Sequence, residues 1–560
     1  MSIFTRRHFL GSMGALGAAG SVPGVLAATQ GATGAMSKEI TAIEKEAAGF
    51  ANPLRLPGSS GLFGVLPVSE FREVHVVRSE IEVLPGRRTP ILAYAVESGG
   101  KKFLNPAILA RRGDQMRVRM VNRIDQPTVI HWHGLSVDSR NDGNGLKVVP
   151  PGGSMDYDFT LRDRSSLYWY HPHAHGYIPQ QAYHGLASLL FVEDDDETAL
   201  RKELDLALGD TEIPLVLQDR EFDAQGRLRY APTAAQSFGG WVGDRLLVNL
   251  TERPFIEAGR RIVRFRILNG SNARNYRLAF VQGGRPLDFF LAGTDGGLLA
   301  QPLRIEQTFI APGQRLDVLV DLREADPALP VTLASLTFDP MHNEGGHDMG
   351  HAGHAAPPMT HMGRGQHGAA PAADPSHSMA MEGDARALMR IDLKPSAKYQ
   401  RRMPTVLSSL AAVPVPVTAN LPRRMQLGHN DKGNWTINGQ VFDPKVAALS
   451  VQQGARENWL IQNAERSMPH PMHLHGFLFR VIERLGSPAT VRELAGARGL
   501  LPQDQGLIDT VHVWPGESVR IAIDFTHPHA GDQDFVFHCH TLEHAEAGMM
   551  LRYTVKEGPG

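Results

Sequence analysis

The fold of this chain is decided by the stretch PGESVRIAID, which occupies residues 515–524. It opens on a proline–glycine turn, and the residues after the turn alternate between polar and apolar side chains, as in a β-strand with one buried face. The run QMRVRMV at residues 115–121 alternates in the same way. Turns that contain Gly and Pro recur between such runs, which is typical of β-sandwiches. The sequence therefore predicts an all-β protein.

The same unit of turn and strand recurs at wide spacing along the chain. Proline–glycine pairs introduce strand-like runs at residues 151–154, 312–315 and 515–518, and an earlier run ends at an asparagine in each copy, Asn122, Asn269 and Asn463. Three copies of one unit indicate three similar domains. A chain of 560 residues has room for three or four.

The chemistry of the chain centres on one cysteine. Cys539 is the only thiol in 560 residues, and it stands between His538 and His540, with His544 and Met549 further along. A thiolate, an imidazole and a long thioether contact are ligands of a blue-copper electron-transfer site, which a second histidine from elsewhere usually completes. Because neighbouring side chains on a strand point to opposite faces, the two flanking histidines are free to hold a second metal site. The motif therefore predicts electron transfer.

Three further histidine clusters accompany this motif. They are His131-Trp132-His133, His171-Pro172-His173 and His470-Pro471-Met472-His473-Leu474-His475. A single pair of alternating histidines is weak evidence for a metal, since such a pair can form a solvated strand face. Four clusters favour metal sites over the alternative, which is a set of core histidines satisfied by backbone hydrogen bonds.

These clusters resemble the four copper motifs of the multicopper oxidases, the family of laccases, ascorbate oxidase, bilirubin oxidase and bacterial cuprous oxidases. The resemblance extends from about residue 60 to the C-terminus. It implies three cupredoxin-like Greek-key β-sandwich domains, which we place at residues 50–200, 205–395 and 400–557. The first and third domains would carry all the ligands and hold a three-copper cluster between them. The second would act as a spacer and wall.

The resemblance also implies a role for each ligand. Type 1 copper would be bound by His470, Cys539 and His544 with Met549 as the axial ligand, type 2 copper by His131 and His473, one type 3 copper by His133, His171 and His540, and the other by His173, His475 and His538. With four copper ions the protein would take single electrons from a phenol, an aromatic amine or Cu(I). It would pass them through His538-Cys539-His540 and reduce dioxygen to two waters.

Reduction of dioxygen to water consumes protons, so an acidic group near the cluster is required. Asp142 matches the acid that the family places near the type 2 site, and Asp142-Gly143 is also a common turn pair. Relatives often have a glutamate directly after the second type 1 histidine, where this chain has Ala545. We therefore expect Asp142 to serve proton delivery, with Glu546 in place of the missing acid.

Residues 341–383 interrupt the strand pattern late in the second domain. They contain seven histidines and six methionines amid Gly, Ala and Pro, without a helical or strand period. Thioether and imidazole together favour Cu(I), so one interpretation is capture of that ion, and bacterial cuprous oxidases have a methionine-rich insert over their type 1 site. The other interpretation is a surface insertion without function. We expect the segment to interrupt a hairpin before the run RALMRI at residues 386–391.

A second comparison with the cuprous oxidases concerns the approach to the type 1 site. Met468 matches a methionine that helps those enzymes to bind substrate copper, but Arg466 stands where they have an aspartate. An arginine cannot ligate copper and repels a cation, so Glu465 or an acid of the insert would have to replace the aspartate. Met468 is equally well explained as core packing.

Composition and the N-terminal segment bear on location and partners. A net charge of -2 and a pI of about 7.0 suggest neither nucleic acid nor an anionic membrane surface as a partner. The run TRRHFL at residues 5–10, an apolar stretch and the cleavage candidate Val25-Leu26-Ala27 predict a twin-arginine signal peptide over residues 1–27. The stretch is too short and too rich in glycine to anchor the chain in a membrane. We expect a periplasmic monomer whose mature chain starts near residue 28.

Two other functions remain open. A periplasmic protein that sequesters copper through the His/Met-rich segment would confer copper tolerance, although sequestration does not require a cluster of eight imidazoles. A structural cupredoxin-repeat protein that has lost its copper, as some cell-division relatives have, would not be expected to keep every ligand. The oxidase is therefore the leading hypothesis.

Overall fold

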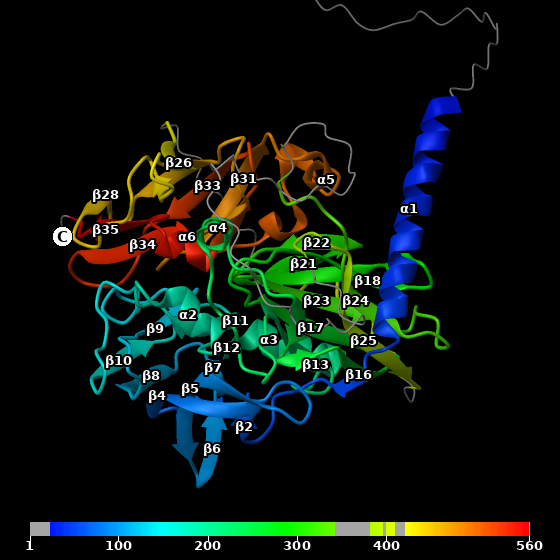
Figure 1. Cartoon of the computed structure of the whole chain (residues 1–560), viewed down its shortest axis with the longest axis horizontal. Helices are drawn as coiled ribbons and strands as arrows, with labels where there is room; N and C mark the ends of the chain where they lie inside the picture. The colour runs from blue at the N-terminus through cyan, green and yellow to red at the C-terminus, as the bar shows by residue number, and fades with distance from the viewer. Residues whose placement is uncertain (1–22, 342–380, 396–398, 409–420, 559–560) are drawn as a thin grey trace, which may run out of the picture.

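The computed structural model describes residues 23–341, 381–395, 399–408 and 421–558. Within these residues, six β-sheets pack as three pairs, and each pair encloses a hydrophobic core (Figure 1). We call these pairs the first, second and third sandwiches. The predicted all-β class with three β-sandwiches is confirmed.

The first sandwich holds the two histidine pairs nearest the N-terminus. One of its sheets has the order β10 (Ser154–Thr160), β8 (Gln115–Asn122), β4 (Glu73–Glu82), β5 (Arg88–Ser98), β6 (Lys101–Leu104), β2 (Gly61–Leu62), and the other the order β3 (Val65–Pro67), β7 (Ala107–Arg111), β12 (Ser188–Glu193), β11 (Ser166–Pro172), β9 (Ile130–His133). The alternating run predicted at residues 115–121 is strand β8, and Met116, Val118 and Met120 point from it into the core. The polar residues between them stay on the outer face, as the alternation requires.

The second sandwich is built from two larger sheets. The first has the order β1 (Asn52–Pro53), β16 (Pro254–Gly259), β25 (Arg386–Lys394), β24 (Val331–Ser335), β18 (Tyr276–Gln282), β19 (Arg285–Leu287), with β22 (Gln307–Ile310) also paired to β18; the second has the order β15 (Thr251–Glu252), β14 (Arg245–Val248), β13 (Glu212–Arg220), β17 (Ile262–Asn269), β23 (Arg315–Asp321), β20 (Phe289–Thr294), β21 (Gly297–Ile305). None of the predicted copper ligands lies on these strands.

The third sandwich holds the remaining predicted ligands. Its sheets have the orders β27 (Trp435–Ile437), β26 (Arg423–His429), β29 (Arg456–Gln462), β33 (Ser518–Asp524), β31 (Phe479–Leu485) and β28 (Ala447–Gln452), β35 (Met550–Lys556), β34 (Gln533–Cys539), β30 (His470–Leu474), β32 (Thr510–Val513). The stretch at residues 515–524 forms a turn and then β33, as predicted. Figure 1 shows this sandwich, in yellow to red, lying against both of the others.

The sequence repeat forms the same structure in each sandwich. The strand after each proline–glycine turn pairs antiparallel with the strand that ends near the asparagine: β10 with β8, β23 with β17, and β33 with β29. Each asparagine donates from its side-chain amide to two backbone carbonyls, one of which lies in the segment before the turn: Val149 for Asn122, Ile310 for Asn269 and Val513 for Asn463. The asparagine therefore ties the end of its strand to the start of the turn.

Helices are few and mostly lie in the connections. They are α1 (Pro23–Ala47), α2 (Ile178–Tyr183), α3 (Asp195–Leu204), α4 (Ala234–Gly239), α5 (Ala489–Arg492), α6 (Leu542–Glu546) and the short 3-10 turns η1 (Ala497–Gly499) and η2 (Pro502–Gln505). Ile40, Ile43 and Ala47 of α1 are buried against the second sandwich, while the other end of the helix projects beyond it (Figure 1). The predicted cleavage candidate at residues 25–27 is part of α1, and the twin-arginine run lies outside the described residues. In the described part of the chain, no helix is long and apolar enough to cross a membrane.

The His/Met-rich segment lies between two neighbouring strands of the second sandwich. Strands β24 and β25 pair antiparallel, so the segment interrupts a hairpin, as predicted. Residues 342–380 lie outside the described residues. The described ends of the segment meet where the backbone N–H of Phe338 donates to the carbonyl of Gly383 at 3.0 Å.

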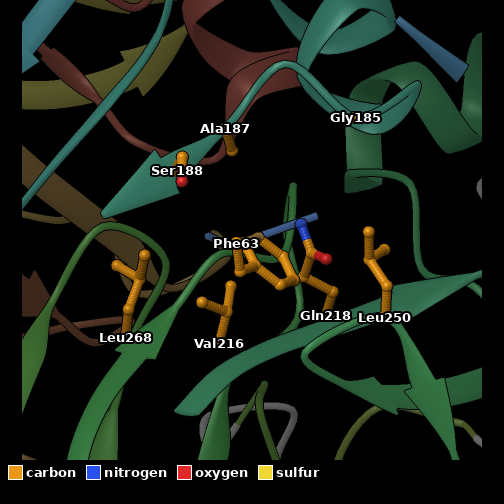
Figure 2. Close-up of a pocket in the computed structure, with 8 residues that line it drawn as sticks. All are labelled: Phe63, Gly185, Ala187, Ser188, Val216, Gln218, Leu250 and Leu268. Atoms are coloured by element: carbon orange, nitrogen blue, oxygen red, sulfur yellow. The ribbon is translucent and has the colours of Figure 1, made fainter. Parts of the chain in front are cut away.

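The first and second sandwiches pack closely against each other. The cavity shown in Figure 2 lies between them and has a volume of about 10 Å³, and its lining comprises Phe63, Gly185, Ala187, Ser188, Val216, Gln218, Leu250 and Leu268. A space of that size holds about one water molecule. This cavity is therefore too small to admit an organic substrate.

Candidate metal centres

Four strands deliver the predicted ligands to one region. Strands β9 and β11 of the first sandwich are antiparallel neighbours and place His171 opposite His131. Strands β30 and β34 of the third sandwich are also antiparallel neighbours and place His473 opposite His538. His173, His475 and His540 lie two residues after His171, His473 and His538, just beyond the ends of β11, β30 and β34. Each pair of adjacent strands therefore carries one group of histidines, and we call these two groups the histidine edges of the first and third sandwiches.

The two edges meet between the first and third sandwiches. The ring of His133 stacks on that of His473, and the ring of His131 stacks on that of His475, each with 3.8 Å between ring centroids. All eight cluster histidines are buried: His131, His133, His171, His173, His473, His475, His538 and His540. The structure thus brings together residues from four separate motifs and excludes water from around them.

Backbone carbonyls determine which ring nitrogen carries the proton on several of these histidines. The Nδ1 atom of His131 donates to the carbonyl of Asp142 at 2.8 Å, and that of His473 donates to the carbonyl of Asp509 at 3.0 Å. Those of His171 and His538 lie 3.0 Å and 2.8 Å from the carbonyls of Pro172 and Cys539. Because a carbonyl oxygen only accepts, each Nδ1 carries the hydrogen and each Nε2 keeps a lone pair.

The lone pairs that remain point at one another. The Nε2 atoms of His131 and His473 are 3.4 Å apart. The Nε2 of His171 is 3.4 Å from the Nδ1 of His133, which also keeps its lone pair because the Nε2 of His133 donates to the Asp509 carboxylate. Two acceptors cannot form a hydrogen bond, and protonation is disfavoured because burial lowers the pKa of His171 to about 3. A cation between the nitrogens satisfies both lone pairs. This donor set of neutral imidazoles fits copper.

The remaining cluster histidines fit the same requirement. The Nε2 of His538 lies 3.0 Å from that of His475 and 3.2 Å from that of His173, and the ligand atoms of these three residues lie within 4.8 Å of one another. The ring of His540 is centred 5.0 Å from that of His133 and 5.3 Å from that of His171. Among the described residues, neither nitrogen of the buried His540 has a hydrogen-bond partner. A metal would supply the missing partner.

A second group lies on the other side of β34. The Sγ atom of Cys539 is 3.6 Å from the Nδ1 of His470 and 3.7 Å from the Nδ1 of His544, and these two nitrogens are 3.2 Å apart. Burial raises the pKa of the Cys539 thiol to about 12, so only a bound cation would make it a thiolate near neutral pH. Met549 is fully buried in the same core, and its carbonyl accepts from the backbone N–H of Cys539. The group offers the donors of a blue-copper site.

The outer edges of the two histidines in this group are covered by protein. The Nε2 of His544 donates to the carbonyl of Phe238 in α4 at 2.9 Å, and the Nε2 of His470 lies 3.1 Å from the Ser467 hydroxyl. The buried Trp435 packs beside both rings and also donates its indole N–H to the Phe238 carbonyl. The second sandwich and its connections thus cover a site whose candidate ligands all come from the third. The sequence motifs did not indicate this cover.

The two predicted acids lie in different surroundings. Asp142 is fully buried, with Oδ2 2.8 Å from the Nδ1 of His475, and burial raises the pKa of its carboxyl well above the ordinary value. Asp142 also belongs to a tight Asp-Gly turn that requires glycine, since a Cβ on Gly143 would lie 1.8 Å from the carbonyl oxygen of Ile130. Glu546 is part-exposed at the start of α2, where its carboxylate accepts from the backbone of Gly176 and Ile178 and pairs with His175. None of these three partners of Glu546 is a cluster histidine.

Sequence reasoning missed Asp509, which touches two cluster histidines. Its Oδ1 lies 2.9 Å from the Nε2 of His133, and its carbonyl accepts from His473. Burial alone would raise the pKa of Asp509, but the ion pair with Arg315 holds it below the ordinary value. A lone aspartate before a short strand has no spacing signal that would have marked it.

Comparison with known proteins agrees with the geometry. Family models described as multicopper oxidase match residues 90–197 and 415–559. The McoA multicopper oxidase of the hyperthermophile Aquifex aeolicus has 32% sequence identity and a TM-score of 0.75, with 90% of this chain and 99% of that one covered. The multicopper oxidase mco of Staphylococcus haemolyticus is 26% identical over 80% of this chain and 81% of its own length. The cell division protein FtsP of Escherichia coli K12 is 27% identical over 99% of each.

The first of these relatives combines sequence identity with a nearly complete structural match. Its structural match covers 90% of this chain, and the two family-model matches fall on the first and third sandwiches, which carry the histidines. The chain therefore belongs to the multicopper oxidase family.

Proposed function

We propose that this protein is a copper-dependent oxidase that couples one-electron oxidations of a reducing donor to the reduction of dioxygen to two waters. Four copper ions would be held by His470, Cys539, His544 and axial Met549 (type 1), by His131 and His473 (type 2), by His133, His171 and His540 (type 3), and by His173, His475 and His538 (type 3). The observation that carries the proposal is the facing pair of Nε2 lone pairs on His131 and His473, 3.4 Å apart.

Strand β34 would connect the two centres. Cys539 belongs to the type 1 group, and its chain neighbours His538 and His540 belong to the buried cluster, so the backbone gives a covalent route between them. Bound copper would supply the one-electron redox chemistry and the binding of dioxygen. The chain's own contribution is to hold both groups rigidly, to keep the imidazoles neutral and to exclude water.

Asp142 is our candidate for proton delivery to the cluster. Its raised pKa lets the carboxyl keep a proton at a higher pH than an exposed aspartate would, and it stands 2.8 Å from the Nδ1 of His475. Glu546 is the candidate for the solvent side, since burial raises its pKa and it is part-exposed beside His175. Protons would then pass from solvent through acids rather than through the apolar core.

Cu(I) is one donor in this proposal, and the support for it is a series of contacts between the base of the His/Met-rich segment and the type 1 group. At the base of the His/Met-rich segment, the Met381 carbonyl accepts from the Arg274 side chain at 2.9 Å. Ala273, which precedes Arg274 in the chain, packs against Gly240, which follows the α4 residues that cover His544. Met468 also packs beside Gly239 of α4. Thioether and imidazole groups of the segment would deliver Cu(I) to this cover, and phenols or aromatic amines would be alternative donors.

A second candidate function is non-catalytic. The similarity to the cell division protein FtsP covers nearly the whole of both chains, so a non-catalytic role in cell division is one alternative. Sequestration of copper by the His/Met-rich segment is the corresponding metal-binding alternative.

Export by the twin-arginine route to the periplasm, as a monomer, is part of our proposal for the oxidase.

Oxygen uptake by the copper-loaded protein tests the proposal. One cell receives Cu(I) and the other a simple phenol, each under air with the apoprotein as control. We expect uptake in both, faster with Cu(I), without release of peroxide. If the fully loaded protein consumed no oxygen with either donor, the oxidase proposal would fail and the non-catalytic functions would replace it.

A further inference from the structure

Arg315 contacts all three sandwiches. It is the first residue of β23 in the second sandwich, directly after the proline–glycine turn, and only 2% of it is exposed. Its Nε donates to the carbonyl of Leu167 on β11 of the first sandwich at 3.0 Å. Its two terminal nitrogens donate to Asp509 of the third sandwich, Nη1 to Oδ1 at 2.9 Å and Nη2 to Oδ2 at 2.5 Å. A guanidinium suits this two-point contact with a carboxylate.

Asp509 connects Arg315 to one proposed type 3 ligand, His133, and to one proposed type 2 ligand, His473. Its Oδ1 accepts from the Nε2 of His133, which leaves the Nδ1 of His133 facing His171. Its backbone carbonyl accepts from the Nδ1 of His473, and its Oδ1 lies 3.3 Å from the same nitrogen, which leaves the Nε2 of His473 facing His131. The nitrogen left to bind a metal is therefore Nδ1 on His133 but Nε2 on His473. Asp509 accounts for both assignments.

Asp295 of the second sandwich accepts hydrogen bonds from the main chain on both sides of the contact between Arg315 and Asp509. One carboxylate oxygen accepts from the backbone N–H of Arg315 at 2.7 Å. The other accepts from the backbone N–H groups of Asp509 and Thr510 at 3.2 Å and 3.3 Å. The second sandwich therefore holds Asp509 at its main chain and at its side chain.

Two glycines allow the main chain to pack closely around this contact and the neighbouring His540. Gly134, which follows His133 and has φ +90°, approaches so closely that an added Cβ would lie 2.6 Å from the Nη2 of Arg315 and 2.7 Å from the Oδ2 of Asp509. Gly313 approaches His540 so closely that an added Cβ would lie 2.9 Å from its ring. The main chain at Gly134 therefore packs directly against the guanidinium and the carboxylate.

We propose that Arg315 is a positioning residue for the copper cluster: through Asp509 it sets which nitrogen His133 and His473 offer to the metal. The inference rests on the proposed function. Without the guanidinium, the Asp509 carboxylate would lose the two-point contact that fixes its orientation and would be free to turn away from the ring nitrogens of both histidines. Outer contacts of this kind fix the tautomer and orientation of ligating histidines, and losing them weakens metal binding about 10–100-fold. The second sandwich would then be part of the cluster's support and not only a spacer and wall.

The third sandwich offers a matched control. Arg484 is buried and makes the same two-point contact with Asp504, Nε to Oδ2 at 2.7 Å and Nη2 to Oδ1 at 2.9 Å. Its Nη1 also donates to the carbonyl of His512 and to the carboxylate of Glu517, and none of these three partners is a predicted copper ligand. Arg484→Lys removes an equally buried fork from the same protein without touching the cluster.

The experiment compares copper-loaded wild type, Arg315→Lys and Arg484→Lys as full chains. The readouts are copper per chain, the electron paramagnetic resonance spectrum of type 2 copper, the blue absorption of type 1 copper, and the melting temperature. We expect both variants to lose stability and both to keep the blue band. Only Arg315→Lys should bind cluster copper about 10–100-fold more weakly and show an altered type 2 spectrum.

A second variant keeps the inference testable if Arg315→Lys does not fold. Asp509→Asn preserves size, but its amide can donate to His133 and so permit the wrong tautomer, and we expect the same spectral change. Unchanged type 2 spectra and copper retention in both variants, or an equal change in Arg484→Lys, would overturn the role of Arg315. A wild-type protein without any type 2 spectrum would instead overturn the proposed function, so the two failures are distinct.

Discussion

At the scale of single residues, the candidate centres depend on where hydrogens sit on buried rings. The carbonyls of Asp142 and Asp509 take the Nδ1 hydrogens of His131 and His473, and the lone pairs left on Nε2 face each other. In the type 1 group the Phe238 carbonyl takes the Nε2 hydrogen of His544, so its Nδ1 faces the thiol of Cys539. Protein oxygens outside each group thus direct the lone pairs inwards.

Cys539→Ser should abolish the blue absorption and the oxidase turnover, because a serine hydroxyl does not replace a thiolate as a soft copper ligand. The fold should remain, with a loss of about 1–3 kcal/mol for the buried hydroxyl. Absorption spectroscopy, oxygen uptake and thermal melting measure the three effects. Val536→Thr places a hydroxyl in the same buried strand and serves as the control, with its colour and turnover retained. A serine variant with wild-type turnover would contradict the assignment of Cys539.

At the scale of elements, a buried charge network ties α3 to the strands of the second sandwich. Glu197 of α3 accepts from Arg264 of β17 and from the Ser165 hydroxyl of the first sandwich. Arg264 also donates to Asp317 of β23, at 2.8 Å from its Nε. These side chains are buried, so each charge depends on its partners. The network joins the element that leaves the first sandwich to the strand that begins at Arg315.

Glu197→Gln should destabilise the protein by about 3 kcal/mol at neutral pH, because it leaves a buried arginine with one charge partner fewer. Burial alone would raise the pKa of Glu197, but Arg264 and Arg266 outweigh it and hold the pKa below the ordinary value. The ionised carboxylate therefore stabilises the fold above a pH of about 4, and this contribution is lost as the pH falls further. Urea unfolding at several pH values should show the difference between wild type and variant shrinking in acid.

The exposed pair of Glu257 and Lys394 provides the control for that variant. Glu257→Gln should change the unfolding free energy by no more than about 1 kcal/mol, as is usual for exposed ion pairs. An equal loss in both variants, or a difference that does not change with pH, would show that the buried network does not carry the charge dependence.

At the scale of the whole molecule, the first and third sandwiches supply the candidate ligands and the second supplies contacts that hold them. The second sandwich and its connections provide Arg315 beside the cluster and α4 over the type 1 group. The same connections reach the base of the His/Met-rich segment through Arg274. Contacts within the second sandwich and its connections therefore link the base of the His/Met-rich segment to the type 1 group.

Deletion of residues 342–380 should lower the rate of Cu(I) oxidation several-fold and leave phenol oxidation nearly unchanged, because only Cu(I) uses thioether and imidazole groups for delivery. A matched variant keeps the length and replaces the histidines and methionines of these residues by serine. It should reproduce the effect of the deletion if composition matters. Equal losses with both donors would show that the segment does not recruit Cu(I).

Sequence alone predicted the parts of the molecule that carry a periodic or spaced signal. The alternating run of β33 and the repeated asparagines predicted the sandwiches, and the spaced histidines predicted the residues that meet in the cluster. Arg315 and Asp509 could not be recognised in this way, since they are 194 positions apart and single charged residues have no spacing. Their contact depends on how the second and third sandwiches pack. The cover that Phe238 forms over His544 is unpredictable for the same reason.

The central claim is that lone pairs on buried histidines are held in place for copper, and anomalous X-ray diffraction at the copper absorption edge tests it most directly. Crystals of the copper-loaded protein should show four peaks. One should lie among Cys539, His470 and His544, and three among the eight histidines between the first and third sandwiches. Peaks confined to other parts of the protein, with none at the facing nitrogens of His131 and His473, would contradict the account.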